Sequence, residues 1–199
     1  PRPTTDPINN TKPDATLFVA APRINGIQPS HRGNRIHMKV RIHRGTRQIG
    51  GTCIEVAAES APGRIALDLG LPLDTDTDDL DSLMPEVPGL REGSDDLLAV
   101  LISHPHQDHV GLVHGIHPSL PIGIGLAGQR ILDCAADWLE RPKLEGRPLI
   151  HWQSGQPTAL GPFTITPYLV DHSAYDAYAL LIEADGQRLF YSGDFRGHG

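Results

Sequence analysis

The fold is decided by residues 97–109, which read Leu97-Leu98-Ala99-Val100-Leu101-Ile102-Ser103-His104-Pro105-His106-Gln107-Asp108-His109. The first half of this stretch is a continuous apolar run of strand length, which is typical of a strand buried on both faces. The second half follows the carboxyl end of that strand, the edge at which ligands collect in open α/β sheets. It places His104, His106, Asp108 and His109 within six residues. Such a cluster does not pack as core, and imidazole with carboxylate suits zinc, iron or manganese.

The spacing of these four side chains indicates two metal positions. His104 and His106 are two residues apart on a turn, so both can converge on one ion. Asp108 and His109 point to the other side of the turn and can hold a second ion. The sequence therefore predicts a metal site directly after a central buried strand.

Strand patterns lie on both sides of this segment. Residues 36–42 alternate apolar and polar side chains, the pattern of a half-buried strand. Asp185-Gly186 predicts a hairpin between the last two apolar runs. Further strands are expected over residues 52–58, 64–69, 121–126, 163–170, 177–184 and 187–192. Strands, then strand–helix alternation, then strands again predict a layered α/β or α+β fold.

One helix is expected over residues 128–140, ended by Pro142. Its apolar stripe consists of Ile131, Leu132, Ala135, Ala136 and Leu139. Cys53 and Cys134 cannot form a disulfide framework, and both are interpreted as small buried hydrophobic residues. Residues 72–96 are acidic and rich in turn formers, which favours a solvated loop, with a substrate-facing loop as the alternative.

Composition bounds the class of protein. A chain of 199 residues can build one sizeable core, and 39% hydrophobic with 21% charged residues is ordinary for a globular protein. The formal net charge of −7 argues against broad electrostatic capture of nucleic acid, although bound metal would cancel part of it locally. No apolar run approaches the length of a membrane span and no signal peptide is evident, so a cytoplasmic location is expected. Residues 1–35 are interpreted as a poorly ordered lead-in to one domain over residues 36–199.

The motif His-x-His-x-Asp-His, after an apolar strand and before Val110-Gly111-Leu112, resembles the signature of the metallo-β-lactamase superfamily. Three further stretches resemble the other family motifs in order. They are Leu67-Asp68-Leu69-Gly70, Asp171-His172-Ser173 and Tyr191-Ser192-Gly193-Asp194. The resemblance runs from about Arg41 to the last residue. It implies a four-layer αββα sandwich, of which this chain would supply the first half and the start of the second.

The resemblance also implies residue roles. His104, His106 and His172 would hold one metal ion, Asp108 and His109 the second, and Asp194 would bridge the two. The ions would be zinc, with manganese or iron as alternatives. Asp68 would fix a ligand by hydrogen bond, and Asp108 would also orient a metal-bound hydroxide or carry its proton. Asp171 is a candidate group on the substrate side, Arg196 a candidate phosphate contact, and His198 a candidate acid, base or ligand.

The implied activity is hydrolysis by a dinuclear metal centre, and the local sequence favours one branch of the family. The runs Gly50–Glu55, Leu67–Pro72 and Ser192–Arg196 are similar to the RNA-processing branch that includes ribonuclease J-like proteins. The working hypothesis is a phosphodiesterase acting on RNA or single-stranded nucleic acid. A thioester or lactone hydrolase, which the acidic charge favours, and a non-catalytic fragment or binding module are the alternatives. A sandwich truncated in its second half would expose an apolar face, so self-association or a homo-oligomer is expected.

Overall fold

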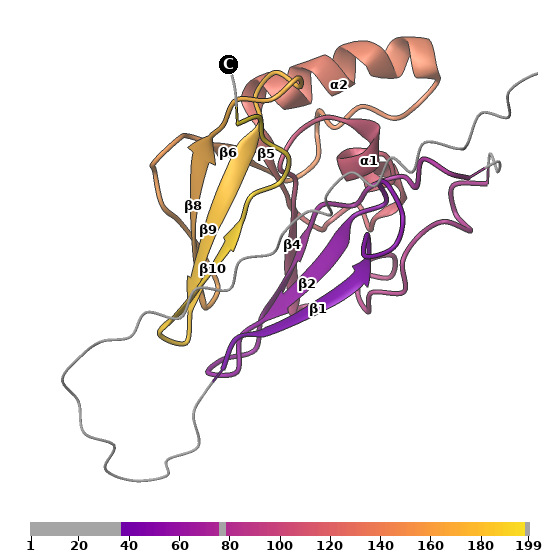
Figure 1. The fold of residues 1–199 in the computed structure, drawn as a ribbon. Coiled ribbons are helices and arrows are strands. Elements are labelled where there is room, and N and C mark those ends of the chain that lie inside the picture. Colours follow the sequence, from indigo (N-terminus) through magenta and orange to yellow (C-terminus); the bar gives the residue numbers. More distant parts are fainter. Residues whose placement is uncertain (1–36, 76–78, 198–199) are drawn as a thin grey trace, which may run out of the picture.

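The computed structural model describes residues 37–75 and 79–197, which form two facing β-sheets with helices on one side (Figure 1). The first sheet contains β1 (Lys39–Arg44), β2 (Cys53–Ala57), β3 (Arg64–Leu67), β4 (Leu97–Leu101), β5 (Ile122–Gly125) and β6 (Leu149–Trp152), in that spatial order. Strands β1 to β3 pair antiparallel, whereas β3 to β6 pair parallel. The parallel part places the ends of β3, β4 and β5 at one edge of the sheet.

The second sheet is antiparallel, with the spatial order β10-β9-β8-β7. It contains β7 (Thr158–Leu160), β8 (Phe163–Leu169), β9 (Tyr178–Ala184) and β10 (Gln187–Tyr191). The predicted hairpin between β9 and β10 is confirmed. Asp185 and Gly186 both adopt positive φ, 55° and 68°, as a two-residue turn of this kind requires.

Two apolar cores hold the layers together. One lies between the sheets and joins inward-facing residues of both, among them Leu67, Leu101, Phe163 and Leu180. The other lies on the outer face of the six-stranded sheet, under α1 (Gln107–Val110), the 3-10 turn Val113–Gly115 and α2 (Leu126–Leu139). Strand β4 contributes to both cores because successive side chains point to opposite faces. This is why its sequence is apolar throughout.

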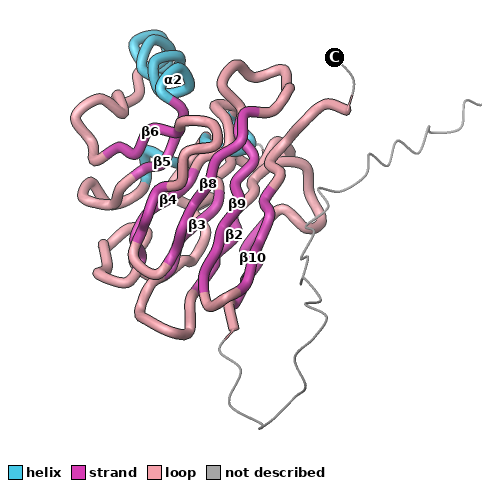
Figure 2. The backbone as a smooth tube through the Cα atoms, turned by 90° about the vertical axis from the view of Figure 1, so that its left-hand side faces the viewer, coloured by secondary structure: helices cyan, strands magenta, loops and turns pink. Residues whose placement is uncertain are grey.

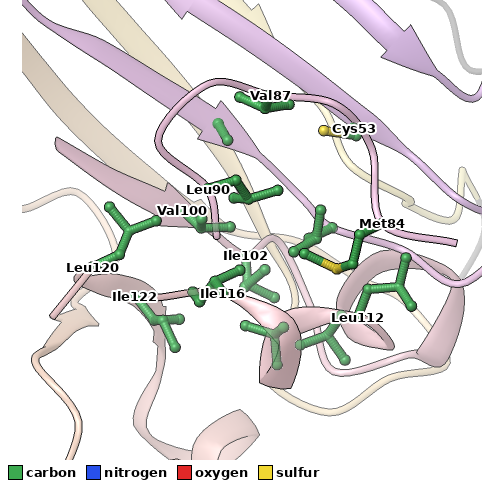
Figure 3. Packing of buried hydrophobic residues seen from close by; sticks show 14 of the residues in the cluster. Cys53, Met84, Val87, Leu90, Val100, Ile102, Leu112, Ile116, Leu120 and Ile122 are labelled. Atoms are coloured by element: carbon green, nitrogen blue, oxygen red, sulfur yellow. The ribbon is translucent and has the colours of Figure 1, made fainter. Parts of the chain in front are cut away.

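The acidic segment 72–96 is not simply a solvated loop. Met84, Val87 and Leu90 are buried in the outer core, where they pack with Cys53 and Ile116 (Figure 3). The acidic side chains around them obscured this contribution in the sequence. Strands β6 and β7, of four and three residues, were also not predicted.

Helix α2 differs from its prediction in which side chains are buried. It begins two residues earlier than expected, and Leu132 and Ala136 pack on the core. Ile131 and Leu139, however, are 45% and 53% exposed, and Cys134 is exposed as well. The prediction that Cys134 is buried is therefore wrong, whereas Cys53 is fully buried. The apolar pattern of α2 wraps around more of the helix than the sheet covers.

The outer face of the four-stranded sheet turns toward the viewer in Figure 2. Within residues 37–75 and 79–197 no helix packs on this face, and Tyr168 and Phe190 are each 42% exposed there. The described residues thus supply three layers of the αββα sandwich that the sequence resemblance implies: one helical layer and both sheets. Self-association through the open face stays a prediction. Neither α2 nor another helix of the described part of the chain has the length and apolar character needed to cross a bilayer.

Candidate metal centre

Four strand ends converge where the two sheets meet. In the first sheet, Asp68 follows β3 and the segment Ser103–His109 follows β4, its parallel neighbour. In the second sheet, β8 and β10 both run antiparallel to β9, so the residues that follow them also share an edge. His172 lies in the loop after β8, and Asp194 lies three residues after β10. The fold therefore gathers all six predicted ligands from three separate segments, and a fourth segment supplies Asp68 beneath them.

Asp68 forms the buried base of the cluster. Its side chain is fully inaccessible and accepts four hydrogen bonds. Oδ1 accepts from the Ser103 amide at 2.7 Å, and Oδ2 accepts from the Ser103 hydroxyl at 2.8 Å and His109 Nδ1 at 2.6 Å. The hydroxyl of Tyr191 also donates to Oδ2. A buried carboxylate needs such partners, and these donors fix the direction in which the His109 ring points.

His104, His106 and His172 form the first metal-competent group. His104 Nδ1 lies 3.0 Å from the Ser103 hydroxyl, so Nε2 is the nitrogen free to bind metal. That Nε2 atom is buried and finds no hydrogen-bond partner among the described residues. His106 Nδ1 and His172 Nε2 lie 3.2 Å apart. Two nitrogen ligands of one tetrahedral zinc ion lie about 3.3 Å apart, so this spacing fits such an ion.

The second group consists of His104, Asp108 and His109, so His104 belongs to both. His109 Nε2 faces Asp108 Oδ2 at 3.7 Å and Asp194 Oδ1 at 3.4 Å. The other oxygen of Asp194, Oδ2, lies 4.0 Å from His172 Nε2. Asp194 therefore spans the space between the two groups, the position that a bridging carboxylate would need.

The electrostatics of the cluster suit bound cations. Burial disfavours a charged His109, but Asp68 and Asp194 outweigh this effect and raise the pKa of His109 to about 10. The hydrogen bond with His109 lowers the pKa of Asp194 to about 2, and His109 keeps the pKa of the buried Asp68 below its usual value. Burial, reinforced by His109, lowers the pKa of His104 to about 3, and burial also lowers the pKa of His172. His104 and His172 are thus neutral and the carboxylates ionised, as metal ligands must be, whereas Asp68 and Asp194 hold on His109 a proton that a bound cation would displace.

The donor set fits bound divalent metal. An orphaned buried imidazole nitrogen, a pair of ring nitrogens at ligand spacing and a carboxylate between two groups are each expected of residues that hold metal. Imidazole with carboxylate suits zinc, iron or manganese. Asp68 and Ser103 lie behind the ligands and orient them.

The loop that carries His172 is fastened to helix α2 by Asp176. Its carboxylate accepts a hydrogen bond from the Gly128 amide at 2.8 Å, in the first turn of α2. The N-cap residue Gly125 has no side chain to do this, and a Cβ there would lie 2.1 Å from Asp176 Oδ2. Asp176 therefore caps the helix from a distant loop and ties the first metal-competent group to the helical layer.

Asp176→Gly is expected to lower the free energy of unfolding by about 1 kcal/mol, because the helix cap is lost while glycine tolerates the φ of 68° at this position. Metal binding by the group containing His172 should weaken, and binding by the group containing His109 should persist. Urea denaturation and metal titration measure the two effects. Glu140→Gly, at the opposite end of α2 with a φ of 52° and an exposed side chain, is the matched control and should weaken neither quantity.

The remaining predicted residues lie at the rim. Arg196 is exposed, and its amide donates to the Asp171 carbonyl oxygen at 2.7 Å, so the two loops that carry His172 and Asp194 are joined. Asp171 is exposed beside His172. His198 lies outside the described residues.

Sequence reasoning assigned no role to Ser103, Tyr191 or Asp176. Ser103 and Tyr191 stood inside quoted motifs, but nothing local to them indicates that their hydroxyls reach Asp68. The signal for Asp176 was the glycine at the start of α2, which leaves the helix without a cap of its own. A partner for that helix end had to come from elsewhere in the chain.

The chain is similar to several known proteins, among them two that are named ribonuclease J. Ribonuclease J of Sinorhizobium meliloti is 27% identical over 119 residues, 59% of this chain and 21% of its own length. Ribonuclease J of Helicobacter pylori is 24% identical over 160 residues, 76% of this chain and 22% of its own. A solved structure of a protein of unknown function from Enterococcus faecalis superposes with a TM-score of 0.70 at 27% identity, covering 81% of this chain and 44% of that one. The chain thus spans about a fifth of the length of these curated relatives.

The family described as the Beta-lactamase superfamily domain matches residues 73–198, which is more than half of the chain. That stretch contains the central strand β4, the histidine motif and both loops of the second sheet that reach the site. Two facing sheets with a histidine and aspartate cluster at their common edge are what the sequence motifs implied. The chain therefore belongs to the metallo-β-lactamase-fold branch of the beta-lactamase superfamily, and its curated relatives are of the ribonuclease J kind.

Proposed function

We propose that this protein is a metal-dependent phosphodiesterase acting on RNA or other single-stranded nucleic acid. The observation that carries the proposal is the pair of metal-competent groups sharing His104, with Asp194 between them. Two such positions suit displacement at phosphorus, in which attacking and leaving oxygens both need stabilisation. The likeness to proteins named ribonuclease J supports a nucleic-acid substrate. A cytoplasmic location stays a prediction of the sequence.

Different residues of the chain would bind the metal, handle the proton and contact the substrate. When bound, divalent ions lower the pKa of a coordinated water to about 7 and withdraw charge from the phosphoryl oxygen. Asp108, whose side chain is 22% exposed and lies 3.7 Å from His109 Nε2, would orient a water molecule and accept its proton. Asp68 and Ser103 keep the imidazoles in place from behind. Arg196, an exposed residue two positions after Asp194, would meet a phosphate of the substrate.

The second candidate is hydrolysis of a small thioester or lactone. The observation that favours it is the net charge of −7, which does not attract a polyanion over the whole surface. The same ligands would serve that reaction, since the fold hosts several kinds of hydrolysis and does not choose among them. Substrate tests must therefore include both classes.

Hydrolysis by the zinc- or manganese-loaded protein is the test. Labelled single-stranded RNA and bis-p-nitrophenyl phosphate should be cleaved, and a chromogenic thioester and lactone should not. Asp108→Asn should reduce turnover by roughly 100-fold or more, because it removes both a metal ligand and the proton acceptor. The loss in a variant purified in the same way excludes a contaminating nuclease. His114→Ala, which changes a half-buried histidine outside both metal-competent groups, should retain activity. Cleavage of the thioester or lactone without cleavage of RNA would overturn the proposal in favour of the second candidate.

A further inference from the structure

Tyr191 ends β10 with its ring in the core between the sheets and its hydroxyl against a carboxylate. The residue is 6% exposed and belongs to the same apolar cluster as Leu101 and Leu180. A buried phenol normally finds a hydrogen-bond partner, and here the partner is Oδ2 of Asp68, at the end of a strand in the other sheet. The contact therefore joins the two sheets directly beneath the candidate metal centre.

The protons around Asp68 can be assigned from the hydrogen-bond network. The hydroxyl of Ser103 has one proton, which it donates to Asp68 Oδ2, so His104 Nδ1 must be the donor in its contact with Ser103. His109 Nδ1 likewise donates to Asp68. Both imidazoles consequently present Nε2 to the side on which Asp108 and Asp194 lie. One carboxylate thus sets the tautomers of two histidines.

The direction in which His109 points therefore depends on the orientation of the Asp68 carboxylate. Oδ1 is held by the Ser103 amide alone, whereas Oδ2 is shared among Ser103, His109 and Tyr191. Ser103 and His109 both belong to the segment that carries the ligands and would move with it. Tyr191 approaches from the other sheet and is an independent anchor.

The segment after Tyr191 also packs closely against Ser103. Gly193 adopts a φ of 53°, and a Cβ there would lie 2.8 Å from Ser103 Cβ. The Ser103 carbonyl oxygen in turn accepts a hydrogen bond from the Tyr178 amide at 2.9 Å. Tyr178 and Tyr191 of the second sheet thus hold Ser103 and Asp68 from one side. Asp194, next to Gly193, lies against the ligand His109.

We propose that Tyr191 is a positioning residue for metal binding: its hydroxyl restrains the Asp68 carboxylate and thereby holds His109 with Nε2 toward the metal. The inference rests on the metal centre of the proposed function. Removal of the hydroxyl takes away the one restraint on Asp68 that comes from the other sheet, so His109, which donates directly to Asp68 Oδ2, is held less firmly. His106 and His172 do not contact Asp68, and His104 reaches it only through Ser103, whose amide stays bonded to Oδ1. The effect should therefore fall on the ion held with His109.

Tyr191→Phe tests this, because it removes one hydroxyl and keeps the ring. Zinc affinity is measured by competition with a chromophoric chelator, and the His109 tautomer by the ring nitrogen shifts of the zinc-loaded protein. We expect one of the two zinc ions to bind roughly 10- to 100-fold more weakly, as for other groups that orient metal ligands, with the other ion unaffected. Tyr168→Phe makes the same chemical change on the exposed outer face of the same sheet and should alter neither affinity.

The outcomes separate this inference from the proposed function. Unchanged zinc affinities and an unchanged His109 tautomer in Tyr191→Phe would overturn the positioning role and leave the hydrolase proposal standing. Equal weakening of both ions, with the tautomer retained, would mean a general loosening of the core and would also overturn it. Wild-type protein that binds no zinc would remove the proposed function together with the inference.

Discussion

His104→Ala should release both metal ions, whereas His172→Ala and Asp108→Asn should each release one. The reason is the position of His104 in both metal-competent groups, combined with a side chain that is 1% exposed and a buried Nε2 without a partner among the described residues. The rings of His109 and His172, one from each metal-competent group, pack against the His104 ring, with centroids 4.1 and 4.6 Å from its own. Elemental analysis of the purified, dialysed variants gives the number of ions per chain.

The family resemblance assigns His104 to one ion, so the result discriminates between two assignments. Loss of a single ion in His104→Ala would contradict the shared position and restore the simpler allocation. His114→Ala is the matched control, since it removes a half-buried imidazole outside the cluster and should leave the metal content at its wild-type value. Circular dichroism of each variant shows whether metal was lost from a folded chain.

The position of the site could be predicted because its evidence is local in sequence. A strand apolar on both faces, followed at once by His104 to His109, specifies the edge of the sheet at which ligands gather. The satellite motifs then placed Asp68, His172 and Asp194 in the same cluster, and the structure brings all of them together. The site could be located because its ligands follow the ends of strands, and the ends of strands can be recognised from the sequence.

The supporting contacts could not be predicted, because they join residues remote in sequence. Tyr191 and Asp68 are 123 residues apart, and Asp176 reaches Gly128 across 48. No periodicity or propensity carries information on such pairs. The same limit explains α2, where the spacing of Ile131 and Leu139 indicates an apolar helix face but cannot say how much of that face a sheet will cover.

Gly70 shows how the backbone of one motif positions another. A Cβ at residue 70 would lie 1.7 Å from the carbonyl oxygen of Asp108 and 2.4 Å from its carbonyl carbon. Both are backbone atoms and cannot rotate away. The loop segment around Gly70 is also fixed, since the Leu69 amide donates to the His109 carbonyl at 2.8 Å and the Leu71 amide to that of Gln107 at 2.8 Å. Asp108 and His109 can therefore occupy their positions only because residue 70 has no side chain and lets the backbone of α1 pack closely against it.

Gly70→Ala is accordingly expected to cost roughly 3 kcal/mol or more of folding stability, because relief of the clash requires α1 to shift and break these hydrogen bonds. Any folded remainder should bind metal weakly, since Asp108 and His109 would move with α1. Gly128→Ala is the matched control: its Cβ would meet ordinary contacts at 3.6 Å, so alanine in this helix should be neutral or stabilise by up to about 1 kcal/mol. Urea denaturation of both variants measures the difference. Similar unfolding midpoints would mean that α1 yields easily, and the metal ligands on it would then be held by Asp68 and not by the backbone of residues 69–71.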